Sequence, residues 1–175
     1  NTRIRIIEAT FSLAQSGVLV PTAQQVADKS GMGIRTVFRQ FSDMEALFIR
    51  ADQVLIDRLT AREKILPSGT LEQRIQTLCK YLNEVYEEFS PYLQMTLVQI
   101  WRYKILRKNY RNVADNLKKQ VIQFFPELKE KPRHTQLAVV NNLAFEMWNR
   151  YRSMDKLDKS EIEESMIATV TCLLK

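Results

Sequence analysis

The residues whose types and spacing best suit recognition chemistry lie between positions 33 and 40 of this 175-residue chain. Arg35 and Arg39 are four positions apart, so in a helix both guanidinium groups project from one face. Arginine can donate two hydrogen bonds to a guanine edge, glutamine can pair with adenine, and apolar groups can contact the methyl group of thymine. The pattern therefore favours a surface that fits the major groove of DNA. On this interpretation the outward residues are Ile34, Arg35, Phe38 and Arg39, flanked by Thr36 and Gln40.

A helix-turn-helix arrangement over residues 22–41 would position this face. Thr22 followed by Gln25 is a capping-box pattern that begins a short helix. Gly31 can end that helix, because a residue without a Cβ adopts a left-handed turn at little cost. The N-termini of both short helices can donate N–H groups to phosphates. A plain three-helix packing unit with a solvated arginine face has the same spacing, so both interpretations stay open. The small core expected beneath the motif is Val26, Met32, Val37, Phe41 and Leu47.

Residues 3–50, and most closely residues 22–47, resemble the tetracycline-repressor (TetR) family of transcriptional regulators. The resemblance implies that the helix over residues 33–40 enters the major groove and that Thr22 contacts a phosphate. It also implies a dimer built by the last two long helices and a small-molecule effector bound behind the fourth helix. The matching positions are Thr22, Val26-Ala27, Gly31-Met32, Thr36-Val37-Phe38, Phe41 and Glu45-Ala46-Leu47. The candidate DNA-binding residues are Thr22, Gly33, Ile34, Arg35, Thr36, Phe38, Arg39 and Gln40.

Four positions depart from the family pattern. Gly33 replaces a serine cap, Phe38 replaces tyrosine, Gln40 replaces histidine, and Met44 replaces a lysine that holds the DNA backbone. Loss of a hydroxyl and a cation predicts weaker non-specific affinity and a flatter salt dependence. These departures keep an alternative function open, namely a TetR-fold interaction module that binds a protein or small molecule without binding DNA.

The composition predicts an all-α fold with about nine helices, because only four glycines and five prolines interrupt the chain. We expect a helix-turn-helix DNA-binding domain over residues 1–48 and a helical effector-binding and dimerisation domain over residues 49–175. Ser90 and Pro91 suit a helix start, with proline in the first helical position. The expected helices cover residues 2–15, 22–30, 33–40, 43–64, 70–89, 91–107, 110–124, 133–154 and 158–175.

The last two expected helices are apolar over wide surfaces, and a helix with two apolar faces needs burial on two sides. One side can meet the core of its own chain and the other a second copy, which predicts a homodimer through these helices. A fully internal helix in a monomer is the alternative. The two apolar stripes of the helix over residues 133–154 are Leu137, Val140, Ala144, Trp148 and Tyr151, and Val139, Leu143 and Met147.

All six tyrosines and both tryptophans lie after residue 50. A single aromatic residue at helical spacing is more often part of a core than of a ligand site, so a pocket here is implied by the family resemblance and not by the spacing. The candidate effector-binding residues are Phe89, Tyr92, Met95, Trp101, Tyr103, Phe145 and Trp148.

Charge and reactive residues narrow the class of function. The net charge is +6, which permits a polyanionic partner. Seven basic residues against one acidic residue over positions 102–119 are interpreted as a solvated face, with an anionic effector or an extra DNA contact as alternatives. Cys79 and Cys172 are far apart and His134 is the only histidine, so we predict no metal, no cofactor and no enzyme activity. The absence of a membrane-length apolar run and of a signal peptide predicts a cytoplasmic protein without a membrane partner.

Overall fold

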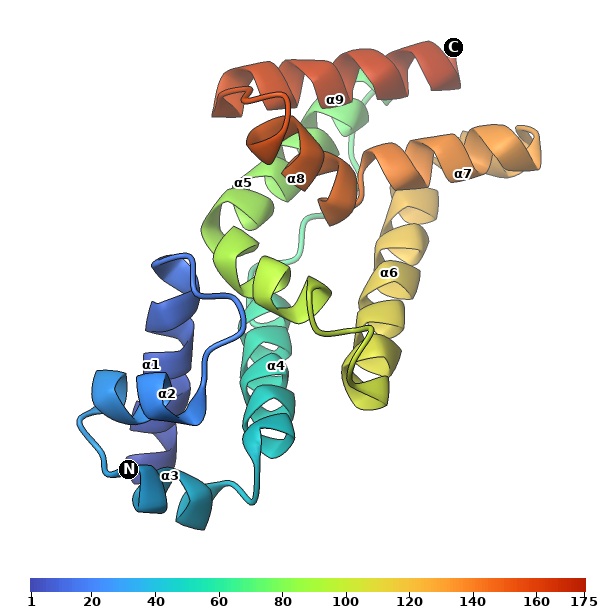
Figure 1. Cartoon of the computed structure of the whole chain (residues 1–175). Coiled ribbons are helices and arrows are strands. Elements are labelled where there is room, and N and C mark those ends of the chain that lie inside the picture. The colour runs from blue at the N-terminus through green and yellow to red at the C-terminus, as the bar shows by residue number, and fades with distance from the viewer. The chain divides into compact units, whose positions relative to one another are not determined.

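The computed structural model describes all 175 residues, which form nine α-helices and one short 3-10 helix (Figure 1). The predicted all-α class is confirmed. None of the helices is both long enough and apolar enough to span a bilayer. The helices are α1 (Thr2–Gln15), α2 (Ala23–Ser30), α3 (Ile34–Gln40), α4 (Met44–Thr60), α5 (Leu71–Leu97), α6 (Lys104–Phe124), the 3-10 helix η1 (Pro126–Glu130), α7 (Arg133–Asn142), α8 (Phe145–Ser153) and α9 (Lys159–Leu174).

The chain forms two compact units, each built from two segments. Unit 1 comprises Asn1–Arg62 and Ser90–Arg111, and unit 2 comprises Glu63–Phe89 and Asn112–Lys175. The boundaries cross α5 and α6, so each of these helices contributes residues to both units. The expected division of function between residues 1–48 and 49–175 stays a prediction.

The core of unit 1 begins with α1, which contacts α2, α3 and α4. Residues 90–111 add to this core, since the ring of Tyr92 lies 4.8 Å from that of Phe11 and the ring of Tyr103 lies 6.1 Å from that of Phe48. Of the five residues expected beneath the helix-turn-helix, Met32 is half-buried. The four buried ones are Val26, Val37, Phe41 and Leu47.

The core of unit 2 joins α5, α8 and α9 through a buried polar link. The indole N–H of Trp148 donates to Asn83 Oδ1 at 2.7 Å, and the Asn83 amide donates to the carbonyl of Lys159 at 2.9 Å. Asn83 is fully buried, and these two bonds give partners to both the oxygen and the NH2 group of its side chain, as buried polar groups require. The apolar face of α9 in this core is Ile162, Met166, Val170 and Leu174.

The predicted break at Ser90-Pro91 is wrong, because α5 continues from Leu71 to Leu97 with Pro91 inside it. Proline in a helix interior removes one hydrogen bond and costs about 3 kcal/mol or more. Buried positions nevertheless continue at helical spacing through this point, at Phe89, Leu93 and Thr96. The burial of this stripe outweighs the local cost of proline.

The predicted break between residues 107 and 110 is also wrong. The chain turns earlier, over residues 98–103, and α6 then runs without interruption. The Arg107 guanidinium stabilises this turn by donating to the carbonyls of Ile100 at 2.9 Å and Trp101 at 3.0 Å. These two bonds satisfy carbonyls that the turn leaves without helical partners.

The predicted single helix over residues 133–154 is wrong, because it is divided into α7 and α8 at Leu143-Ala144. Ala144 is extended, with ψ of 153°, although neither glycine nor proline is present. The hydroxyl of Tyr86 donates to the Leu143 carbonyl at 2.9 Å. Tyr86 lies on α5, so a buried phenol from a distant part of the chain stabilises the break between α7 and α8. No local sequence pattern connects the two sites.

Candidate DNA-binding surface

The first helix of the motif has well-defined ends. The Gln25 N–H donates to Thr22 Oγ1 at 3.2 Å and the Thr22 N–H donates to Gln25 Oε1 at 2.8 Å, which confirms the capping box. Gly31 follows α2 with φ of +66°, as expected. A Cβ at Gly31 would lie 3.6 Å from the nearest atom, Arg5 Nη2, so space is available. The left-handed backbone therefore accounts for glycine here, since other residues pay about 1–2 kcal/mol to adopt it.

The second helix, α3, is anchored by one buried residue, Val37, and ends at buried Phe41. Arg35 and Arg39 are exposed, and Ile34 and Phe38 are 37% and 45% exposed. Thr22 and Gly33 are exposed as well, whereas Thr36 and Gln40 are half-buried. The structure therefore brings the α3 residues onto one outward face around the two arginines. Their role in DNA binding stays a prediction.

Two arginines of α1 close the carboxyl ends of both motif helices. Arg3 donates from Nε and Nη2 to the carbonyl of Gln40 at 3.2 and 2.8 Å, and its guanidinium lies 5.3 Å from the centre of the Phe41 ring. Arg5 Nη2 donates to the carbonyl of Ser30 at 3.1 Å. A guanidinium at a helix C-terminus satisfies free carbonyls and complements the helix dipole. Neither arginine was expected from the sequence to take this role, and no local signal identifies them.

The start of α4 follows α3 after a three-residue link. Asp43 caps it by accepting a hydrogen bond from the Ala46 N–H at 2.8 Å. Met44 is partly buried against a cluster formed by Phe48, Tyr103 and Leu106. The methionine at a position where the family pattern has lysine is thus part of the core of unit 1.

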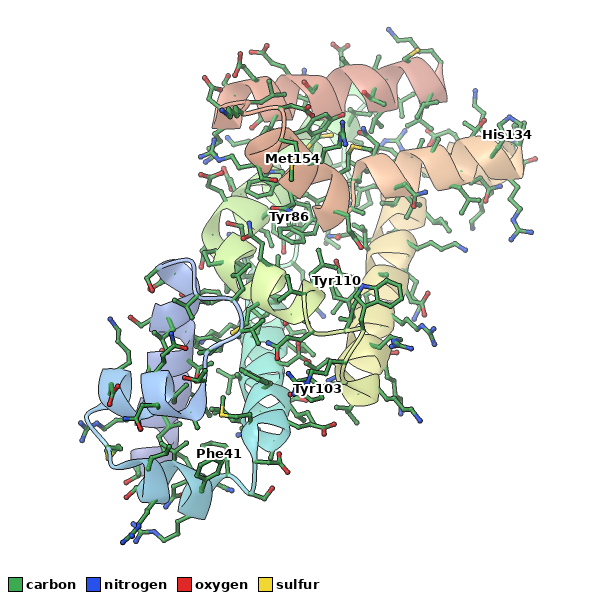
Figure 2. The ribbon with its side chains drawn as sticks, in the orientation of Figure 1. Phe41, Tyr86, Tyr103, Tyr110, His134 and Met154 are labelled. Carbon is green, nitrogen blue, oxygen red and sulfur yellow. The ribbon has the colours of Figure 1, made fainter.

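Four of the candidate effector-binding residues lie in unit 1, and the structure places them differently (Figure 2 labels Tyr103). Met95 and Tyr103 are buried, whereas Trp101 is 80% exposed. Tyr92 is half-buried, and its hydroxyl accepts a hydrogen bond from Gln15 Nε2 at 2.6 Å. The Arg107 guanidinium lies 5.7 Å from the centre of the exposed Trp101 ring.

A buried acid in unit 1 was not expected from the sequence. Asp52 is 5% exposed and accepts hydrogen bonds from the Thr96 hydroxyl at 3.1 Å and the Asn109 amide at 2.8 Å. Burial raises the pKa of the Asp52 carboxyl above its usual value, against the opposing effect of these two hydrogen bonds. One signal in the sequence could have indicated this burial: Asp52 lies on the same face of α4 as Phe48 and Leu55.

The other three candidate effector-binding residues, Phe89, Phe145 and Trp148, are buried in unit 2. Phe145 and Trp148 are stacked, with ring centroids 6.0 Å apart. Tyr86, which was not expected from the sequence, completes this group at 5.5 Å from Phe145 and 6.0 Å from Trp148 (Figure 2). The three-residue spacing between Tyr86 and Phe89 could have indicated that both lie on the same face of the helix. Burial raises the pKa of the Tyr86 hydroxyl, with a further contribution from the charge of Glu146.

The reactive groups are dispersed. Burial raises the pKa of the Cys79 thiol to about 12, whereas Cys172 is exposed. His134 is exposed in the first turn of α7, as expected (Figure 2). No group of three or more His, Cys, Asp or Glu side chains is arranged to hold a metal ion.

The fold, unlike the sequence, is similar to that of known proteins. The sequence matches no family model and has no significant match among curated proteins. A transcriptional regulator from Rhodococcus sp. Rha1 superposes with a TM-score of 0.78 at 17% identity, over 99% of this chain and 96% of that chain. A protein from Mesorhizobium loti MAFF303099, provisionally assigned as a TetR-family transcriptional regulator, superposes with a TM-score of 0.63 at 17% identity, over 99% of this chain and 95% of that chain. The chain therefore has the all-helical fold of these two regulators.

Proposed function

We propose that this chain is a sequence-specific DNA-binding transcriptional regulator, and more narrowly a ligand-responsive homodimeric repressor. The observation that carries the proposal is the exposed α3 face around Arg35 and Arg39, on a helix-turn-helix whose capping box and Gly31 turn are both in place. The names of the two similar structures support the same function.

The proposed operator is pseudo-palindromic double-stranded DNA. Two copies of α3 would enter successive major grooves about 34–36 Å apart. The proposed dimer forms through α7, α8 and α9, since Leu137 is 44% exposed and Ile167 and Leu173 are only half-buried in the single chain. A second copy would bury this apolar surface.

The proposed effector is a small molecule that binds the helical region over residues 49–175. It shifts the DNA-binding equilibrium only by its differential affinity for the two forms of the protein. The regulator acts in the cytoplasm and requires neither a cofactor nor a membrane, and we assign it no enzymatic step.

Fluorescence anisotropy with DNA from upstream of its own gene, and with duplexes selected from a random pool, tests the proposal. Arg35→Ala and Arg39→Ala should each cost about 1–3 kcal/mol and relax one operator position if the arginine reads a base edge. A uniform loss across operator variants would instead identify a phosphate contact. The control is Lys118→Ala/Lys119→Ala, which removes two exposed cations from unit 2. Unchanged affinity of the double arginine variant for the selected operator would overturn the proposal.

An interaction module without DNA binding is the second candidate. Met44 supports it, because a side chain partly buried against Phe48 and Tyr103 offers no cation to a phosphate. Binding to selected duplexes that is no tighter than binding to unrelated competitor DNA would favour this candidate.

A further inference from the structure

The positive charge of this chain is concentrated in one of its two units. Unit 1 has thirteen Lys and Arg against six Asp and Glu, a net charge of +7, whereas unit 2 has thirteen against fourteen. Residues 1–62, which contain the helix-turn-helix, supply only +2 of the +7. The remaining +5 comes from residues 90–111, which contain five basic and no acidic residues. The second segment of unit 1 is therefore its main source of positive potential.

The basic segment is held beside the start of α4. Tyr103, the residue before α6 (labelled in Figure 2), packs on Phe48. The same cluster contacts Met44 and Ile49. Met44 follows the last residue of α3 by only four positions. The first turn of α6 thus lies next to the element that directly follows the proposed reading helix.

Two cations at this end of α6 are presented to solvent. Arg102 and Lys104 are both exposed, and the Arg102 guanidinium lies 5.4 Å from the centre of the Tyr103 ring. The two hydrogen bonds from Arg107 hold the preceding turn in shape. Arg102 and Lys104 therefore project from a backbone that is already ordered, so little backbone freedom is lost when they bind a partner.

The charges near Arg102 and Lys104 indicate which partner these two residues bind. Asp43 and Glu45 at the start of α4 repel a phosphate near the end of α3, and cations from a neighbouring element can offset this repulsion. Phosphate contacts orient a protein on the duplex without reading sequence. We propose that Arg102 and Lys104 bind the DNA backbone beside the groove entered by α3. The proposal rests on the proposed function and adds a second DNA-contacting element outside the helix-turn-helix.

Salt titration of the full-length chain against a 30-base-pair duplex (about three helical turns) of unrelated sequence tests the proposal, because phosphate contacts do not require an operator. Arg102→Gln/Lys104→Gln should flatten the slope of log K against log salt by about 0.9 for each phosphate that is no longer neutralised, while sequence preference on selected DNA is retained. The charge-retaining variant Arg102→Lys/Lys104→Arg should keep the wild-type slope. Thermal unfolding of each variant verifies that the fold is intact.

Two further double variants distinguish direct phosphate binding from a general charge effect. Lys108→Gln/Arg111→Gln removes the same charge one and two turns further along α6, and Lys118→Gln/Lys119→Gln removes it from unit 2. We expect a smaller effect from the first pair and none from the second. Equal slopes for all three variants, or a wild-type slope for Arg102→Gln/Lys104→Gln, would overturn the proposal.

The outcome is separable from that of the proposed function. Loss of sequence preference in the Arg35 and Arg39 variants tests the reading helix, whereas the slope tests Arg102 and Lys104. An unchanged DNA slope with abolished binding to phosphatidylglycerol-containing vesicles would assign the cations to an anionic membrane surface and overturn the proposal. Failure of the wild-type chain to bind any duplex would overturn both.

Discussion

The guanidinium of Arg3 donates two hydrogen bonds to the carbonyl of Gln40, 37 positions later in the chain. A seven-residue helix such as α3 is unstable by itself, because helix nucleation is unfavourable and few bonds follow it. Its stability depends on Val37 in the core and on partners at its ends. Arg3 is the partner at the carboxyl end.

Arg3→Ala is therefore expected to destabilise α3 selectively. Amide hydrogen exchange in α3 should accelerate by about tenfold, because a charge-assisted hydrogen bond contributes on the order of 1.5 kcal/mol. Arg5→Ala is the matched variant, since Arg5 donates to Ser30 at the end of α2 and its removal should accelerate exchange in α2. Equal acceleration of both helices by both variants would contradict this assignment.

Phe38→Tyr is expected to strengthen DNA binding with little effect on the fold, since Phe38 is 45% exposed. A phenolic hydroxyl adds a donor for a phosphate but adds no charge. Affinity should rise for all sequences alike, with an unchanged salt slope, in anisotropy titrations. Met44→Lys is the contrasting variant. It adds a positive charge, which Phe38→Tyr does not, and it does so at a position partly buried against Phe48. A change of sequence preference in Phe38→Tyr would show that residue 38 reads bases.

The buried carboxyl of Asp52 is expected to make stability depend on pH. Its pKa is raised by burial, so the folded state favours the neutral acid. This contribution is complete below the unfolded-state pKa of about 3.9 and is lost as the pH rises through the higher folded-state pKa. The stability of the wild-type chain minus that of Asp52→Asn should therefore fall with rising pH.

Urea unfolding at a series of pH values from about 3 to 7 measures this difference. The other acids of unit 1 are present in both proteins, so their titration cancels. A difference that stays constant, or that rises with pH, would show that the folded state does not favour the protonated acid.

Trp148→Phe is expected to destabilise unit 2. The substitution keeps an aromatic ring but removes the donor to Asn83 Oδ1, which is then buried without a partner. The expected loss is about 1–3 kcal/mol in unfolding free energy. Tyr151→Phe on the same helix is the control, because its hydroxyl accepts a longer, 3.3 Å bond from Asn142 in a half-buried position. A loss in Trp148→Phe no greater than that in Tyr151→Phe would contradict the role of the Asn83 bond.

Local signals were sufficient for the helix-turn-helix. The Thr22 capping box and the turn at Gly31 involve residues within a few positions of one another, and both were predicted. The total of nine helices was also predicted, but partly for the wrong reasons. Two expected breaks, at Pro91 and between residues 107 and 110, do not occur, and two unexpected breaks occur, over residues 98–103 and at Leu143-Ala144.

The missed features depend on contacts between distant parts of the chain. Tyr86 stabilises the break between α7 and α8 from 57 positions away, and Arg3 reaches Gln40 across 37. Asp52 has its hydrogen-bond partners in α5 and α6, 44 and 57 positions later. Helical spacing describes which face of a helix is apolar, but it does not specify which distant side chain meets that face. The caps and the turn of the helix-turn-helix could therefore be predicted, whereas the long-range contacts of Arg3, Asp52 and Tyr86 could not.

The construction of unit 1 from two separated segments has a consequence for biosynthesis. A ribosome that has released α1 to α4 has produced the reading helix but not residues 90–111. Phe48, which is 3% exposed in the completed protein, still lacks its contact with Tyr103 at that stage. Asp52 also lacks its two hydrogen-bond donors at that stage, because Thr96 and Asn109 come later in the chain. The nascent chain thus cannot complete the unit that contains the helix-turn-helix first, and α4 keeps apolar surface exposed to chaperones until well over half of the polypeptide has been translated.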